Sequence, residues 1–326
     1  MRHTYRVAAT TFLLMSLHPF SALSQPAPYP NKPIRWLNSS QQGGGVDVIA
    51  RMVVNEASGK LGRTLVIDNR AGASGIIAMA LLHQAPADGY TLLATAGSLV
   101  SSAFALKRVP FDIRTEIIPV ARLSSQPYVI VVHPSFPAKS VSDLVRYAKS
   151  KPGAINYAST GSGSASHIGM ELFQSLTGTK MVHISFKSAG PALIELLGGH
   201  SQLVFISSVL SASTHVKGGR LRGLAVTGAQ RSRVFPELPT VQESGVNGFE
   251  LTNWYACFAP RGTPQPILRA LNDAFGYAIS LPVVRSRIEG GGAEATPISL
   301  DEFNKVFLSE LRKLDDFIKK TGFRLK

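Results

Sequence analysis

The chain has 326 residues, 44% of them hydrophobic, and a formal net charge of +14. That length and apolar content are sufficient for one large or two medium α/β domains with buried cores. The single cysteine, Cys257, excludes an internal disulfide and is expected to be a buried structural thiol. The basic residues are scattered and no aromatic-plus-basic motif is present, which argues against a nucleic-acid partner; the positive charge would instead steer small anions.

The first 24 residues have the pattern of a secretory signal peptide. Two arginines precede an apolar run over residues 7–17, and the small residues at 22–24 offer a cleavage site. The apolar run is too short to span a bilayer. We therefore expect residues 1–24 to be removed and the mature protein to be exported, with a buried N-terminal helix as the alternative. Residues 25–33, QPAPYPNKP, are predicted to form a Pro-rich N-terminal tether.

After the tether, short apolar runs alternate with segments of helical periodicity. Eight runs are candidate strands: residues 34–37, 64–69, 90–94, 127–133, 155–159, 181–186, 202–207 and 221–227. Their apolar residues are bunched rather than alternating, which is typical of strands buried on both faces of a parallel sheet. The alternation of strands and helices predicts an α/β fold.

Two of the predicted helices have recognisable ends. Ser140 with Asp143 resembles a capping box, and Ser299 with Glu302 resembles another at the start of the last long helix. Gly322 is placed to end that last helix.

Standard catalytic signatures are absent from the sequence. It contains no HExxH, GxSxG, CxxC or GxxxxGK[ST] motif, and no pair of its eight histidines has metal-ligand spacing. We therefore expect no metal and no cofactor. An exported α/β protein of this kind is a candidate binding protein.

The strongest ligand-binding signal is the stretch NYASTGSGSASHIGMELF at residues 156–173. A strand ends, a loop of hydroxyls and glycines follows, and a helix begins. Helix N-termini expose unpaired N–H groups and carry a positive partial charge, so this loop suits a carboxylate without Lys or Arg. An ordinary polar loop with a serine cap is the alternative. The candidate ligand residues here are Ser159, Thr160, Gly161, Ser162, Gly163 and His167.

Two further loops follow predicted strand ends. The segment KSAG turns into a helix near Pro191, a residue that suits a helix start. The segment ATAGS offers hydroxyl donors at the end of another strand. The candidate ligand residues in these loops are Lys187, Ser188, Ala189, Thr95 and Ser98.

A glycine-rich stretch, NSSQQGGGVDVIAR at residues 38–51, precedes another helical segment. Its glycines lack the dinucleotide-binding spacing, because position 48 is valine, and no Lys-Ser/Thr pair follows them. Asp47 falls in the first helical turn, where it either caps the helix or holds a ligand amine. The candidate ligand residues here are Ser39, Ser40, Gly44, Gly45 and Asp47.

In their order, these segments resemble a known family. The segments YPNKPIR, GGGVDVIAR, DNRAGASG, APADGYTLL, VPFD, NYASTGSGSASH, PALIELLGGH, LRGLAVT, LPTVQESG and W…APRGTP are similar to those of the Bug or TctC-like periplasmic solute-binding proteins of tripartite tricarboxylate transporters. The resemblance implies a type II periplasmic binding protein fold, with two α/β lobes, a central ligand cleft and a hinge. The chain would cross between lobes near 126–128 and 251–254. Lobe 1 would then be about 28–126 plus 253–326, and lobe 2 about 127–252.

The resemblance also implies a function. The chain would be a periplasmic monomer, not an enzyme, that captures a small organic anion, most simply a di- or tricarboxylate. It would deliver this anion to the membrane permease subunits of a tripartite tricarboxylate-type transporter.

The chain departs from the usual pattern of this family at three places. Residues 38–40 are Asn-Ser-Ser where an apolar-Pro-Phe segment is common. Residues 186–188 are Phe-Lys-Ser in place of Tyr-Lys-Gly, and residues 200–202 are His-Ser-Gln in place of Gln-Val-Asp. We expect the fold to tolerate these changes and the ligand preference to differ, because Ser39 and Ser40 add donors where a ring is usual.

Three other functions fit parts of the sequence. A ligand sensor that feeds a membrane signalling partner shares every feature of a transport receptor. A secreted serine hydrolase would use a loop serine with His167, but no orienting acid is evident. A basic nucleic-acid binder would rest on net charge alone.

Overall fold

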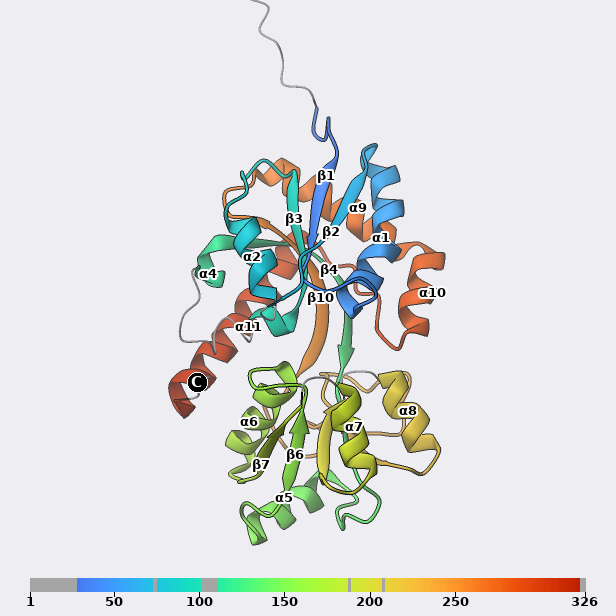
Figure 1. The fold of residues 1–326 in the computed structure, drawn as a ribbon, viewed down its shortest axis with the longest axis vertical. Helices are drawn as coiled ribbons and strands as arrows, with labels where there is room; N and C mark the ends of the chain where they lie inside the picture. Colours follow the sequence, from blue (N-terminus) through green and yellow to red (C-terminus); the bar gives the residue numbers. More distant parts are fainter. Residues whose placement is uncertain (1–27, 73–74, 101–110, 187–188, 207–208, 323–326) are drawn as a thin grey trace, which may run out of the picture.

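The computed structural model describes residues 28–72, 75–100, 111–186, 189–206 and 209–322. These residues form two α/β lobes stacked along the long axis of the molecule (Figure 1). The first lobe is built on a five-stranded sheet with the order β2-β1-β3-β10-β4, and the second lobe on a five-stranded sheet with the order β7-β6-β8-β5-β9.

The sheet of the first lobe is mixed. Strand β1 (Ile34–Asn38) pairs in parallel with β2 (Leu65–Asn69) and with β3 (Thr91–Ala96). Strand β10 (Thr252–Pro260) lies antiparallel to both β3 and β4 (Ile117–Pro127). Neither β4 nor β10 was among the predicted strands.

The second sheet is mixed as well. Strand β6 (Asn156–Ser159) pairs in parallel with β7 (Val182–Ser185) and β8 (Leu203–Ile206). Strand β5 (Val129–Val132) lies antiparallel to β8 and to β9 (Arg222–Val226). The bunched apolar runs, which are typical of parallel sheets, therefore belong to two mixed sheets. All four residues of β5 are buried, so a central antiparallel strand has the same bunched apolar sequence as a parallel one.

Helices surround both sheets (Figure 1). In the first lobe they are α1 (Gly45–Leu61), α2 (Ile76–His83), α4 (Ile113–Glu116), α9 (Gln265–Ser280), α10 (Pro282–Gly290) and α11 (Leu300–Thr321). In the second lobe they are α5 (Val141–Ser150), α6 (Ala165–Thr177), α7 (Ala189–Leu197) and α8 (Val209–Lys217). Among the residues just described, no helix is long and apolar enough to cross a membrane.

The predicted helix caps are confirmed. The Ser140 side chain accepts a hydrogen bond from the N–H of Asp143, and the Ser299 side chain accepts one from Glu302. Gly322 follows α11 in the left-handed conformation, with φ of 66°. Each cap satisfies backbone groups that the helix itself leaves unpaired.

Each lobe has its own apolar core. In the first lobe, Trp36 on β1 meets Phe275 on α9 edge-on, with ring centroids 4.9 Å apart. In the second, Phe173, Phe205 and Phe249 form a triad of T-shaped contacts. Cys257 lies fully buried in the first core, and burial raises the pKa of its thiol, as expected of a structural cysteine.

The chain passes between the two sheets at two adjacent places. Strand β4 ends at Pro127 just before β5, and β10 begins at Thr252 after the second lobe. Thr227 joins the two passages, because its Oγ1 accepts the Tyr128 N–H at 2.7 Å and donates to the Leu251 carbonyl at 2.6 Å. Two side-by-side connections give the lobes a common axis about which to move.

The C-terminal helix also links the lobes. Helix α11 descends from the first lobe toward the second (Figure 1). Phe317 and Ile318 near its end pack against Ile168 of α6. At the other end of the chain, Tyr29 donates a hydrogen bond to the Gly89 carbonyl at 2.8 Å, so the described part of the Pro-rich segment is docked on the first lobe.

Candidate functional site

The carboxyl ends of β1 and β3 bring two predicted ligand residues together. Asn38 and Ala94 are partners in the parallel pairing, so the residues that follow them lie side by side. The Ser39 hydroxyl donates a hydrogen bond to Thr95 Oγ1 at 2.9 Å. Ser98 lies close by in the chain, half-buried in the helical residues 97–100. This edge of the first lobe therefore brings predicted ligand residues together: Ser39 and Ser98 are half-buried, and Thr95 is buried beneath Ser39.

Asp47 holds the glycine-rich turn together. Its side chain is 1% exposed, and Oδ2 accepts hydrogen bonds from the Gly43 N–H at 2.9 Å and from Arg51 Nε at 2.8 Å. Oδ1 accepts from Asn69 Nδ2 at 2.9 Å. Burial alone would raise the pKa of this carboxyl, but these three partners outweigh burial and hold its pKa below the ordinary value. The Ser40 hydroxyl accepts the Asp47 N–H at 3.1 Å, so both side chains serve the turn, which favours the capping interpretation of Asp47.

The glycines of this turn have packing roles. Gly44 is the N-cap residue of α1 and has an extended conformation. Gly45 lies against Tyr255 of β10, and a Cβ atom at position 45 would overlap the Tyr255 hydroxyl. Gly45 therefore allows strand β10 to approach the start of α1, in addition to any access that it gives a ligand.

The β6–α6 loop is organised by hydrogen bonds within itself. Gly161 and Gly163 have φ of 136° and 79°, which only glycine adopts readily. The Gly161 N–H donates to Ser159 Oγ at 3.2 Å and the Gly163 N–H donates to His167 Nδ1 at 3.0 Å. The N–H of Thr160 donates to Ser166 Oγ at 3.2 Å. Most of the backbone donors that were predicted to face a ligand are thus engaged within the loop.

The loop still presents donors to its surroundings. Ser162 is exposed at the tip of the loop, between the two left-handed glycines. Ser164 is the N-cap of α6 and accepts the His167 N–H at 3.3 Å. The Ser162 hydroxyl and the first turn of α6 therefore form the part of this loop that suits an anion.

Four predicted residues remain, and they lie in three different settings. His167 is 7% exposed and pairs with the loop backbone. Ala189 is exposed at the start of α7, where Pro191 is the third helical residue, close to the predicted helix start. Lys187 and Ser188 lie outside the described residues.

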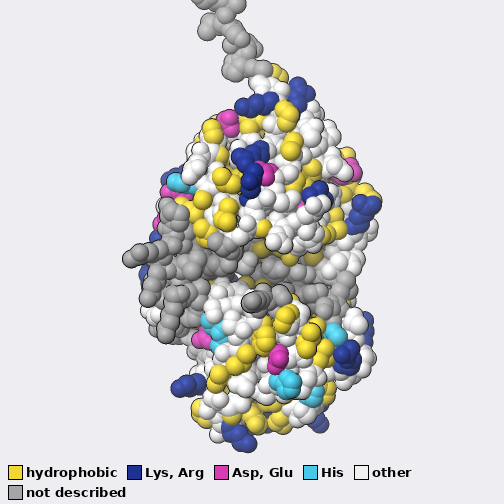
Figure 2. Space-filling view, in the orientation of Figure 1, with side chains coloured by type: hydrophobic (Ala, Val, Ile, Leu, Met, Phe, Trp, Pro, Cys, Tyr) yellow, Lys and Arg dark blue, Asp and Glu magenta, His cyan; other side chains and the backbone are white. Residues whose placement is uncertain are grey.

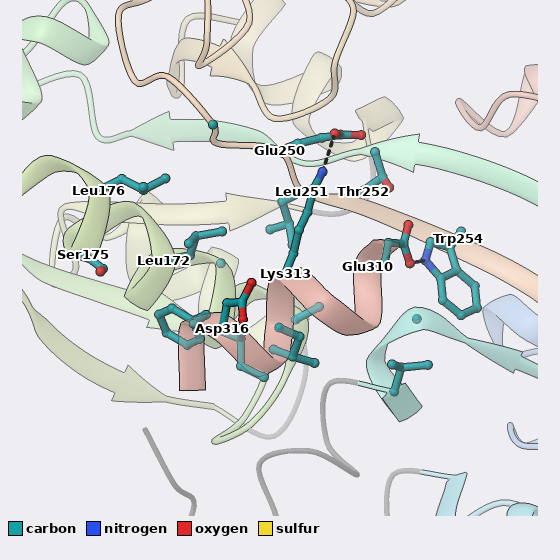
Figure 3. A pocket seen from close by; sticks show the side chains of 18 residues that line it. Leu172, Ser175, Leu176, Glu250, Leu251, Thr252, Trp254, Glu310, Lys313 and Asp316 are labelled. Carbon is teal, nitrogen blue, oxygen red and sulfur yellow. Dashed lines mark hydrogen bonds and ion pairs between the residues drawn. The ribbon is translucent and has the colours of Figure 1, made fainter. Parts of the chain in front are cut away.

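A cavity beside α11 was not predicted from the sequence. It has a volume of about 390 Å³ and lies between α6, α11 and the segment that leads into β10 (Figure 3). Leu172, Leu176, Leu251, Leu314 and Phe317 form its apolar walls. No sequence pattern pairs these elements, because α6 and α11 are far apart in the chain.

Two polar contacts lie in the wall of this cavity. Glu310 accepts a hydrogen bond from Trp254 Nε1 at 2.8 Å, and Lys313 pairs with Glu250 at 3.3 Å (Figure 3). Both tie α11 to the segment where the chain returns from the second lobe. Burial raises the pKa of Glu310 to about 7, against the opposing effects of Trp254 and the nearby Arg122.

The raised pKa of Glu310 predicts a pH-dependent stability. The folded pKa lies above the unfolded value, so the contribution of Glu310 is complete below about pH 4.5 and is lost as the pH rises through about 7. Glu310→Gln stays neutral and can still accept from Trp254. We expect it to match the wild type near pH 4.5 and to exceed its free energy of unfolding by about 2 kcal/mol near pH 8, measured by urea denaturation.

The matched control for that measurement is Glu302→Gln, an exposed position in the first turn of the same helix. It should show no such gain at high pH. Equal stability of Glu310→Gln and wild type at both pH values would contradict the role given to Glu310.

The charged surface has no concentrated basic patch on the face shown in Figure 2. Lys and Arg side chains are scattered over both lobes, as the sequence analysis expected (Figure 2). Many pair with carboxylates, such as Arg35 with Asp68 at 2.6 Å. This distribution does not resemble the continuous basic surface of a nucleic-acid binder.

Comparison with known proteins supports one functional class. The family described as "Tripartite tricarboxylate transporter family receptor" matches residues 49–323. Protein BugT of Bordetella pertussis is 32% identical over 300 residues, which cover 91% of this chain and 92% of BugT.

Two similar solved structures have bound carboxylates. A Rhodopseudomonas palustris protein solved with adipate has a TM-score of 0.75 and 29% identity, over 91% of this chain and 99% of its own. MatC of the same organism, solved with bound malate, has a TM-score of 0.72 and 28% identity, over 89% of this chain and 100% of its own. The likeness extends over nearly the whole of both chains, and it confirms the predicted two-lobed fold of type II periplasmic binding proteins.

Proposed function

The chain belongs to the receptor family of tripartite tricarboxylate transporters, and from this membership we propose that it is an exported binding protein for a small organic anion. The simplest ligand is a di- or tricarboxylate, which the protein delivers to the membrane permease subunits of a transporter of this type. The family consists of receptors and not of enzymes, so the serine hydrolase alternative is excluded.

The observation that carries this proposal is the β6–α6 loop. It presents an exposed hydroxyl at Ser162 and the N-terminal turn of α6, and it is shaped by two left-handed glycines. Helix N-termini of this kind receive anions without a paired cation. Relatives of similar fold were solved with adipate and with malate, and both ligands are dicarboxylates.

The opposite wall of the proposed site is the hydroxyl edge of the first lobe. Ser39 and Thr95 are bonded to each other at the ends of β1 and β3. A ligand held between this edge and the β6–α6 loop would contact both lobes. We propose that the polar segment at 38–40 favours a ligand with additional hydroxyl or carboxylate groups.

We propose the lobe limits that the family resemblance implies: about 28–126 plus 253–326 for one lobe and about 127–252 for the other. Ligand binding would close the lobes about the two chain passages that Thr227 joins. We further propose that residues 1–24 are a signal peptide, that the mature protein lies in the periplasm, and that it acts as a monomer.

A thermal-shift screen tests this proposal. The mature chain is stripped of co-purified ligand by unfolding and refolding, and is then screened against malate, adipate, citrate, aromatic acids and amino acids. A ligand at one hundred times its dissociation constant adds about 2.7 kcal/mol of stability, so we expect a clear rise in melting temperature with at least one carboxylate.

Sodium chloride at matched ionic strength is the control for nonspecific salt effects. The absence of a shift with every organic anion would overturn the proposal.

A further inference from the structure

Two imidazole rings from different elements stack beneath the candidate ligand loop. His167 on α6 and His183 on β7 have ring centroids 3.7 Å apart and planes inclined by only 9°. Tyr157 of β6 stacks with His183 at a centroid distance of 5.1 Å. Three side chains from three elements thus form one layered cluster at the base of the loop.

Each imidazole holds a different end of the glycine turn. His183 Nε2 lies 2.6 Å from Ser159 Oγ, and this same oxygen accepts the Gly161 N–H at 3.2 Å. His167 Nδ1 accepts the Gly163 N–H at 3.0 Å. The segment between the two glycines, which exposes Ser162, is therefore anchored on both sides by the stacked pair.

This arrangement requires a particular protonation state. A ring nitrogen accepts a hydrogen bond only when it carries no proton, so His167 must be neutral with its proton on Nε2. That nitrogen lies 4.0 Å from Glu171 Oε1, beyond hydrogen-bonding distance, and this oxygen accepts hydrogen bonds from Tyr157 at 2.5 Å and from Gln174 at 2.9 Å.

The surroundings favour the neutral pair. The pKa of both imidazoles is lowered to about 4, chiefly by burial; for His183 the neighbouring His167 contributes to this lowering and Glu171 opposes it. The titratable groups that face the pair are Glu171 from α6 and Tyr157 from β6. Near neutral pH the pair is therefore uncharged, and the Gly163 anchor is lost only as the pH falls through about 4.

We propose that His183, which the sequence analysis did not single out, is a positioning residue for the β6–α6 loop. Through Ser159 and through its stack on His167, it holds Gly161 and Gly163 in the conformation that presents Ser162. Its effect on ligand binding rests on the proposed function, whereas its effect on the loop does not.

The alternative is that the two rings only fill space in the second lobe. His183→Phe separates these roles, because a phenyl ring can still stack on His167 but cannot bond to Ser159. If His183→Phe fails to fold, His183→Leu takes its place in the experiment, because a leucine side chain also cannot bond to Ser159 and leaves the bond from Gly161 to Ser159 available. His200→Ala is the matched control, since His200 lies in the same lobe with a 73% exposed side chain.

The first arm of the experiment uses ligand-free mature protein labelled with ¹⁵N at glycine and histidine. NMR spectra are expected to show His167 with its proton on Nε2, and the Gly163 amide signal should move together with the imidazole signals near pH 4. His183→Phe should displace or broaden the Gly161 and Gly163 signals, and His200→Ala should leave them in place. Unchanged glycine signals in His183→Phe would overturn the proposal.

The second arm measures the dissociation constants of malate, adipate and citrate by calorimetry. We expect at least tenfold weaker binding in His183→Phe, with a melting temperature close to that of wild type, and no change in His200→Ala. Wild-type affinity in a folded His183→Phe would overturn the positioning role. Wild-type protein that binds none of the three anions would contradict the proposed function, while the first arm would still decide whether His183 holds the loop.

Discussion

Ser162→Asp is expected to weaken carboxylate binding by more than a hundredfold while leaving the melting temperature of the ligand-free protein nearly unchanged. Ser162 is exposed at the loop tip, so the new carboxylate is readily accommodated without ligand. A bound anion about 4 Å away would be repelled by roughly 4 kcal/mol at the effective dielectric constant of a protein surface. Since about 2.7 kcal/mol corresponds to a hundredfold change in affinity, titration calorimetry would detect this loss easily.

Ser142→Asp is the matched control for the charge change. Ser142 is also exposed, in the first turn of α5 of the same lobe, and was not predicted to contact a ligand. Its substitution should leave the affinity within about twofold of wild type, a difference of roughly 0.4 kcal/mol. Equal losses in both variants would show that the effect is long-range and does not identify the loop as the site.

The second large effect concerns stability. Asp47→Ala should lower the free energy of unfolding by about 3 kcal/mol, because it removes the shared acceptor of the buried Asn38 amide, the Gly43 N–H and the Asn69 amide, and also the partner of Arg51. The folded pKa of Asp47 is depressed, so this contribution is present above the unfolded value and is lost as the pH falls through the folded pKa. Urea denaturation near pH 7 and near pH 3 measures both effects.

Asp68→Ala provides the comparison for Asp47. Asp68 also contacts two arginines, at 2.6 and 2.8 Å, but its own side chain is 23% exposed, against 1% for Asp47. Pairs of this kind contribute about 0–1 kcal/mol each. A loss in Asp47→Ala no larger than in Asp68→Ala would mean that Asp47 does not organise the turn.

The sequence revealed most strands, and the reasons for the failures are physical. Strand β4 has the sequence IIPVARLSSQP, where a proline and two serines interrupt the apolar run. Strand β10 spans nine residues that include Cys257, and only the burial of Cys257 was predicted from this part of the sequence. Strand direction could not be predicted, because a strand that is buried on both faces has the same apolar sequence whether it is parallel or antiparallel.

Short stretches of sequence predicted the loops of the candidate site, whereas the contacts between distant residues in it were seen only in the structure. Loop positions such as Ser39 and Ser162 follow from a strand end and a helix start, which short stretches of sequence reveal. The partnership of His183 with Ser159 depends on how β7 pairs with β6. The bond from Trp254 to Glu310 joins residues 56 positions apart. Such contacts depend on the tertiary fold, so no sequence motif predicts them.

A crystal structure of the mature chain grown with adipate, malate or citrate tests the central claim most directly. We expect the ligand between the lobes, with a carboxylate within hydrogen-bonding distance of Ser162 and the first turn of α6, and with its other end at Ser39 and Thr95. A ligand bound instead in the cavity beside α11, or anywhere that leaves the β6–α6 loop without contact, would contradict it.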